Sequence, residues 1–277
     1  MNEANLQRCR VDRNPAWLRP PLSIGLLGAL LRDAPTVERE LKRDKQGVVT
    51  LHVIDGQRWV VKRESRWPMV MRLRHLLRCS SAWRQWRGAE RLRNIGVRIN
   101  EPVALVHEGR GKQALVLPFV DGVNLHEWLA KPPPEVAAEA RLRVAWAIGS
   151  QMGRITGAGW INRDHKPTNL MIDAACEQRG EQPVLIDLAG IRRRGQFIVP
   201  AGALEMFHVM MRAARRAGPV SLREQLTLLR AAMAEDPTLG RNAAAVARTI
   251  ATLARARPLS YDPGQNNGKA EQQNSRT

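Results

Sequence analysis

The protein has 277 residues, of which 44% are hydrophobic, and its formal net charge at pH 7 is +18. This length and composition suit one large domain or two lobes with a sizeable core, and they exclude a disordered chain. No apolar run reaches the roughly 18 residues that a membrane span requires. The positive charge favours anionic partners, namely nucleic acid, an anionic membrane surface or a phosphorylated substrate. A generally Arg-rich composition without functional meaning is the alternative.

The cysteines and histidines do not suggest a metal site. The three cysteines, at positions 9, 79 and 176, are too few and too far apart for a disulfide framework or a zinc site. None of the six histidines forms a pair at the helical spacing of metal ligands. The sequence therefore predicts a protein of the reducing cytoplasm without structural zinc.

Residues 1–35 carry frequent Pro and Arg, which predicts an N-terminal extension with one short apolar helix at Leu22–Leu31. Arginines precede this helix, so a secretory leader is the alternative. Asp33 follows closely and no small-residue cleavage site appears, which favours a helix that is amphipathic or buried.

Residues 36–118 predict a β-rich lobe of about five strands. The segment 37–43 suits a strand or the start of a helix, whereas Val48–Ile54 is rich in β-branched residues. The Asp55-Gly56 pair then predicts a tight hairpin turn. Further strands are expected at 57–64, 101–109 and 112–120. Between them, apolar residues at spacings of three predict a helix over 82–95, which Gly96 ends.

Residues 119–257 predict a helical lobe, and the polar residues 258–277 predict a disordered tail. Helical patterns occupy 124–130, 133–159, 202–216, 220–234 and 242–256. Two short apolar runs, at 169–173 and 183–190, predict a small strand pair. The expected fold class is α+β, with a ligand cleft between a β-rich lobe and a helical lobe.

The stretch "INRDHKPTNLMID", at 161–173, carries the residue types of phosphoryl transfer. Asp164 is placed to accept a proton from an attacking hydroxyl, while Asn169 and Asp187 offer the hard oxygen ligands that Mg²⁺ prefers. Lys62, in a predicted strand, is suited to bind nucleotide phosphates. Each residue alone is common on protein surfaces, but their order and predicted context agree.

Four motifs extend this pattern: "WVVKRE", "AWRQWRGAERLRNIGVRINEPVAL", "GAGWINRDHKPTNLMI" and "VLIDLAGIRRR". With them the chain resembles the lipopolysaccharide kinase (Kdo/WaaP) family of the protein kinase-like superfamily, over roughly residues 37–216. The resemblance implies a two-lobed protein kinase-like fold, ATP and Mg²⁺ as cofactors, and a sugar hydroxyl of a lipopolysaccharide core or related glycolipid as acceptor.

The resemblance also implies roles for individual residues. Lys62 would bind the phosphates and Asp164 would be the catalytic base. Lys166 would neutralise the transferred phosphoryl group, and Asn169 and Asp187 would bind Mg²⁺. The segment 115–122, which includes Pro118, would be the hinge whose backbone meets adenine.

The chain departs from the kinase pattern at several positions. Gln85 stands where a glutamate usually pairs with the strand lysine, so either Glu90 takes that part or Lys62 lacks its ion pair. Asn162 replaces a histidine of mainly structural importance. The first hairpin has only Gly47 in place of a glycine-rich loop, and three cations of that hairpin are the expected compensation: Lys42, Arg43 and Lys45.

The implied partners are ATP and an anionic glycolipid or sugar acceptor. Residues 66–87 interleave Arg with Trp, Met and Leu, a composition suited to peripheral contact with an anionic membrane, here the inner membrane. A kinase of a small molecule or protein, and a non-catalytic pseudokinase or basic binding module, remain alternatives. No recognised nucleic-acid motif is present, so specific nucleic-acid binding is not expected.

Overall fold

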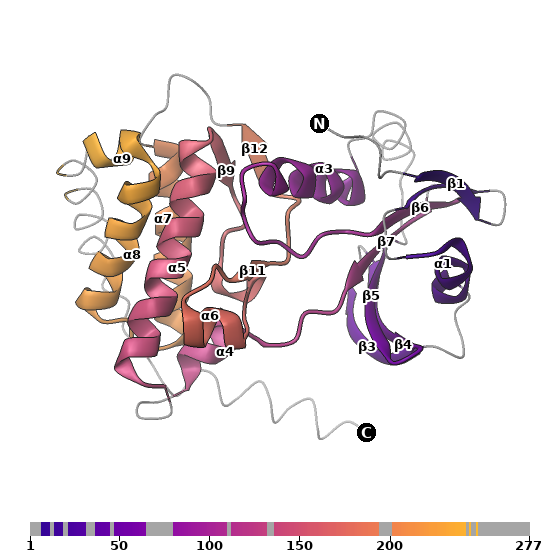
Figure 1. Ribbon diagram of the computed structural model, residues 1–277, viewed down its shortest axis with the longest axis horizontal. Helices are drawn as coiled ribbons and strands as arrows, with labels where there is room; N and C mark the ends of the chain where they lie inside the picture. Colours follow the sequence, from indigo (N-terminus) through magenta and orange to yellow (C-terminus); the bar gives the residue numbers. More distant parts are fainter. Residues whose placement is uncertain are drawn as a thin grey trace.

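The computed structural model describes residues 7–11, 14–18, 22–31, 37–44, 47–64, 80–109, 112–131, 136–193 and 201–241, together with single positions beyond them. A sheet-rich lobe and a helical lobe lie at opposite ends of the molecule (Figure 1). This is the two-lobed α+β arrangement expected from the sequence. Among the described residues, no helix combines the length and the hydropathy that crossing a bilayer requires.

The N-terminal lobe is built on an antiparallel sheet that has seven strands in the described part of the chain, in the order β1-β2-β6-β7-β5-β4-β3. The strands are β1 (Gln7–Val11), β2 (Asn14–Leu18), β3 (Val37–Asp44), β4 (Gly47–Ile54), β5 (Gln57–Glu64), β6 (Ala104–Gly109) and β7 (Lys112–Pro118). The β4–β5 hairpin turns at Asp55 and Gly56, both with positive φ, which confirms the predicted hairpin.

Two of these strands come from the residues expected to form only an extension and a helix. β1 pairs with β2, and β2 pairs with β6, which lies far along the chain. Strands of five residues that contain Pro and Arg show little alternation of polarity, and their partner is remote in sequence. The five strands expected in residues 36–118 are β3 to β7, whereas the expectation of an N-terminal extension without strands was wrong.

One helix covers each face of this sheet. The predicted short helix is α1 (Ile24–Leu31), whose Leu27 and Leu30 are buried against a sheet face that includes Val61. Arg63 donates to the carbonyl oxygens of Leu30 and Leu31 at 3.3 and 2.9 Å, which satisfies the end of the helix.

The opposite sheet face packs against α3 (Ser81–Arg93), the helix predicted from apolar residues at spacings of three. Ser80 caps its N-terminus by accepting a hydrogen bond from the backbone N–H of Trp83 at 3.2 Å. Trp83 and Trp86 are buried against sheet residues that include Leu115. Gly96, with φ of 69°, follows the helix, as expected.

The helical lobe contains α4 (Leu125–Ala130), α5 (Ala138–Gly157), α6 (Ala174–Arg179), α7 (Ala201–Ala217), α8 (Leu222–Glu235) and α9 (Pro237–Arg241). These bounds confirm most of the predicted helices. Most of the expected helix at 242–256, the tail 258–277 and the basic residues 66–79 lie outside the described residues.

Short strands complete the lobe where the functional loops lie. β10 (Leu170–Ile172) pairs with β11 (Val184–Leu185), which confirms the predicted strand pair, and also with β8 (Val123–Asn124). β9 (Trp160–Asn162) pairs with β12 (Ile191–Arg193).

Two helices of this lobe, α5 and α8, pack at unusually close range through glycines. A Cβ at Gly149 would overlap the carbonyl group of Leu228, and one at Gly153 would lie 2.8 Å from the Cα of Ala232. Gly149 meets Leu228 and Gly153, one turn later, meets Ala232, one turn later in α8, so the two helices run parallel. The absence of side chains lets the two backbones touch and fixes α5, which leads directly into β9.

The segment that joins α3 to β6 is attached to the helical lobe. The Arg98 guanidinium binds both carboxylate oxygens of Asp173, at 3.0 and 2.5 Å, and the Arg98 carbonyl accepts a hydrogen bond from the N–H of Leu185 at 3.2 Å. Ile99 forms a parallel bridge with Leu185. These contacts hold the two lobes in register.

Gly149→Ala should destabilise the protein. The added methyl group would collide with the Leu228 carbonyl, and such overpacking costs about 1–3 kcal/mol. Gly25→Ala in α1 is the matched control, since a Cβ there meets nothing within 4 Å and should be neutral or slightly stabilising. Denaturant unfolding of both variants measures the difference. An equal stability of the two variants would contradict the close packing.

Candidate active site

The residues between β9 and β10 form a loop whose backbone is held by its own side chains. Asn162 is buried, and its Oδ1 accepts a hydrogen bond from the N–H of Asp164 at 3.1 Å. Asn169 is also buried and donates from Nδ2 to the carbonyl of Asp164 at 2.8 Å. The Asp164 side chain is left about half exposed, with Lys166 Nζ 3.9 Å from its Oδ1. Asn162 thus gives the structural support expected of the residue that it replaces.

Backbone pairing brings Asp187 beside this loop. The carbonyl of Asn169 accepts a hydrogen bond from the N–H of Ile186 at 3.0 Å, directly next to Asp187. The Asp187 Oδ1 accepts from the N–H of Ala189 at 3.2 Å, which fixes the carboxylate at a turn.

Gly190 allows the two segments to approach. A Cβ at Gly190 would lie 2.7 Å from Asn162 Oδ1 and 3.1 Å from the N atom of Asp164. Any side chain there would push the Asp164 loop away from the segment that carries Asp187. The sequence analysis did not single out Gly190, although a glycine directly after "DLA" and before a strand is a signal of close backbone approach.

Lys62, from the other lobe, lies within the electrostatic influence of Asp187. It lies on β5, on the sheet face that α3 covers, and is half-buried. Burial lowers the pKa of Lys62, whereas the Asp187 carboxylate acts in the opposite direction and Lys42 in the same direction as burial. The acidic group that acts on Lys62 therefore belongs to the opposite lobe.

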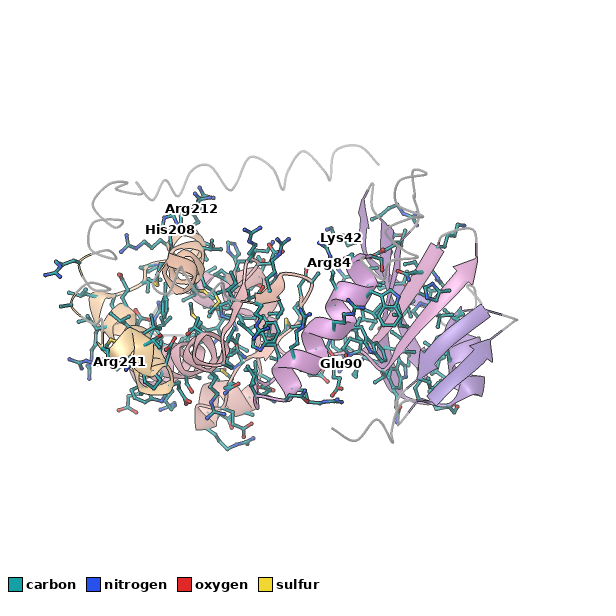
Figure 2. The ribbon with its side chains drawn as sticks, turned by 90° about the horizontal axis from the view of Figure 1, so that it is seen from above. Lys42, Arg84, Glu90, His208, Arg212 and Arg241 are labelled. Carbon is teal, nitrogen blue, oxygen red and sulfur yellow. The ribbon has the colours of Figure 1, made fainter. Side chains whose placement is uncertain are left out.

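The contacts of Gln85 and Glu90 bear on whether a residue of α3 pairs with Lys62. Gln85 is buried and donates from Nε2 to the carbonyl of Ile186 at 3.3 Å. Glu90 accepts a hydrogen bond from Trp86 Nε1 at 3.1 Å, and Figure 2 shows it toward the opposite end of α3 from Arg84. Glu90 does not contribute to the pKa shift of Lys62. A role of Glu90 in cofactor binding thus stays a prediction without support from this geometry.

Three positions along α3 attach the helix to the strand and turn around Asp187. Besides the Gln85 contact, a Cβ at Gly88 would overlap the carbonyl of Leu188, and Arg91 donates to the carbonyl of Ile191 at 3.4 Å. The Arg91 guanidinium also lies 4.7 Å from the ring centroid of Trp160 in β9. The glycine inside the helical pattern was a visible but unused signal of this close contact.

The expected hinge lies at the end of β7. The carbonyl of Pro118 accepts a hydrogen bond from Asn100 Nδ2 at 3.1 Å, and the N–H of Phe119 donates to the carbonyl of Arg58 at 3.0 Å. Because Pro118 has no N–H, it can offer adenine only the second lone pair of its carbonyl. An N–H donor to adenine at the hinge would therefore have to come from a residue after Phe119.

The donor set fits a Mg²⁺ ion that is shared with phosphates. Asn169 uses its amide N–H, so its Oδ1 and the Asp187 carboxylate can both serve as oxygen ligands. No cluster of three or more His, Cys, Asp or Glu side chains occurs in the described part of the chain. Mg²⁺ is commonly bound by one or two carboxylates together with substrate phosphates, so Asn169 and Asp187 could hold it in that way.

His165, next to the expected catalytic base, is fully buried, and the sequence analysis assigned it no part. Neither ring nitrogen has a hydrogen-bond partner among the described residues. Burial lowers the pKa of His165 from 6.5 to about 3. The folded protein therefore keeps this side chain neutral at every pH above that value.

This burial predicts an acid-dependent loss of stability. Below pH 6.5, His165 binds a proton in the unfolded chain but stays neutral in the folded protein. The free energy of unfolding therefore includes the full effect of neutral His165 above pH 6.5 and loses it progressively as the pH falls toward 3. At pH 5 the loss is about 2 kcal/mol relative to His165→Leu, which has no such proton. Denaturant unfolding at pH 7.5 and pH 5 measures this, and parallel losses in both proteins would show that His165 is not neutral when folded.

Comparison with known proteins agrees with this geometry at the level of the fold. No protein-family model matches the chain, and no curated protein does either. Among solved structures, the chain is similar to one described as WaaP in complex with acyl carrier protein. The TM-score is 0.58 at 16% sequence identity, and the match covers 86% of this chain and 98% of that chain. The chain thus shares the two-lobed kinase-like fold of WaaP. The sequence motifs resemble the Kdo/WaaP family, which carries the same name.

Proposed function

We propose that the protein is an ATP- and Mg²⁺-dependent phosphotransferase that acts on a sugar hydroxyl of a lipopolysaccharide core or a related glycolipid. The observation that carries this proposal is that Asp187 of the helical lobe, which lies beside the Asn169 and Asp164 loop, is near enough to Lys62 of the sheet-rich lobe to raise its pKa. A lysine, two oxygen ligands and a carboxylate base in this arrangement serve phosphoryl transfer.

The reaction follows from the positions of these groups. Asp164 accepts the proton of the acceptor hydroxyl as the hydroxyl oxygen bonds to the γ-phosphorus, and the bond from that phosphorus to the bridging oxygen breaks to release ADP. Lys62 binds the phosphates, and Lys166 offsets the charge of the transferred group. Mg²⁺, when bound by Asn169 and Asp187, would neutralise charge on the phosphate oxygens.

The glycolipid acceptor is supported by the family resemblance and by the fold shared with WaaP. Two properties of this chain agree with it. The Asp164 carboxylate is about half exposed, so a large acceptor can reach it, and the net charge of +18 favours an anionic acceptor at a membrane surface. We place the protein in the cytoplasm, at the face of the inner membrane.

Two conservative substitutions should separate metal binding from proton transfer. At a hundredfold excess over Kd, MgATP should stabilise the wild type by about 2.7 kcal/mol, or about 5–10 °C in Tm. Asp187→Asn should lose the Mg²⁺-dependent part of this shift. Asp164→Asn should keep the shift but transfer phosphate about 10²–10⁴ times more slowly.

Labelled ATP, offered with a lipopolysaccharide core and separately with small sugars and proteins, measures the transfer and identifies the acceptor class. The control is Asp55→Asn, which removes an exposed carboxylate from the β4–β5 turn and should behave as wild type. A wild type without a Mg²⁺-dependent shift, or an Asp187→Asn variant that retains it, would refute the proposal.

A further inference from the structure

The β3–β4 hairpin holds a single glycine, and that glycine is used for packing. A Cβ at Gly47 would overlap the carbonyl of Arg63 and lie 3.1 Å from the Cα of Glu64. Gly47 is therefore explained by the close approach of β4 to β5. A hairpin with no other glycine is poorly suited to wrap its backbone N–H groups around phosphates.

A β-bulge in β3 turns a lysine toward the site instead. Glu40 pairs with Thr50, so a regular ladder would place Leu41 opposite Val49. The register shifts between Glu40 and Lys42, and Lys42 takes the position opposite Val49. Bulges of this kind redirect side chains and are common beside functional sites.

The new position puts Lys42 in one row with Lys62. Lys42 pairs with Val49, Val49 with Lys62, and Lys62 with Leu115. Directly paired residues point to the same face of a sheet, and Leu115 packs against α3. Both lysines thus project from the sheet face that carries the proposed phosphate-binding site.

Charge supports the same conclusion. Lys42 depresses the pKa of Lys62, so the two ammonium groups are close enough to repel each other. Figure 2 shows Lys42 and Arg84 on the side of the sheet-rich lobe that faces the helical lobe. Two lysines that face one space on a protein surface form a site for an anion of more than one charge.

We propose that Lys42 is a second phosphate-binding residue, which holds the nucleotide phosphates together with Lys62 in place of a glycine-rich backbone loop. This inference rests on the proposed ATP-dependent function and assigns one part of it. The chemical class of the ligand is a nucleoside di- or triphosphate.

Arg43 offers a matched control within the same strand. The structure does not support the expected compensation by Arg43: it is adjacent to Lys42, so it points to the opposite face, where it pairs with Val48. Lys45, the third expected cation, lies outside the described residues. The Arg43 guanidinium Nε donates to both carboxylate oxygens of Glu40, at 2.9 and 3.1 Å, and its side chain is 66% exposed. Arg43→Met therefore removes one positive charge from the same strand, as Lys42→Met does, without changing the paired residues on the sheet face that carries Lys62.

The test compares the binding of MgATP and of adenosine, which lacks phosphates, to the wild type and to the Lys42→Met and Arg43→Met variants. Lys42→Met should weaken MgATP binding by about tenfold or more, because a charge-assisted contact to phosphate is lost. Adenosine binding should stay unchanged in both variants, and Arg43→Met should bind MgATP as wild type does. Lys42→Arg should restore most of the affinity.

Several outcomes would overturn the inference. One is equal MgATP binding by Lys42→Met and Arg43→Met, and another is a parallel loss of adenosine binding in Lys42→Met, which would indicate a structural defect of the sheet. A wild type that binds no nucleotide would refute both this inference and the proposed function. A wild type that binds MgATP but transfers phosphate to no acceptor would refute only the proposed function, since the nucleotide comparison still decides the role of Lys42.

Discussion

The attachment of α3 to the segment Ile186–Ile191 is the constraint on which the rest of the site depends. A buried glutamine, a glycine without room for a methyl group and an arginine contact three points of this segment from one helix. The same segment carries Asp187 and, through Gly190, touches the backbone of Asp164. Because α3 also packs on the sheet that holds Lys62, a shift of the helix would move the sheet-rich lobe relative to both carboxylates.

This arrangement explains how a glutamine can stand where kinases usually have a glutamate. A glutamate would fix the strand lysine through an ion pair, but burying both charges costs desolvation free energy. Gln85 donates to a backbone carbonyl instead, so α3 is positioned by neutral hydrogen bonding and close packing. Lys62 is then left to interact with Asp187 across the lobes. Asp187 is thus the acidic group that acts on Lys62, while Gln85 attaches the helix to the backbone of Ile186.

The sequence predicted the parts of this protein that depend on local patterns. The hairpin at Asp55-Gly56 and the helix with buried Trp83 and Trp86 follow from turn chemistry and periodicity within short windows. The strands β1 and β2 did not, because their stability comes from pairing with β6, far along the chain. The contacts of Gly88 and Gly190 were also missed, since a glycine can signal a close approach but does not show which segment makes it. The bulge that turns Lys42 needs the register of two strands, which no single segment encodes.

The two lobes thus contribute to the proposed site by different physical means. In the helical lobe, Gly190 and the side-chain amides of Asn162 and Asn169 hold backbone segments at contact distance, which fixes Asp164 and Asp187 within a rigid frame. In the sheet-rich lobe, the lysines stand on long flexible side chains. Ammonium groups act as point charges without a preferred direction, so they tolerate small shifts of a phosphate that a backbone cradle would not. Under the proposed function, geometry would therefore be strict where a proton and a metal ion are placed, and adaptable where only negative charge is held.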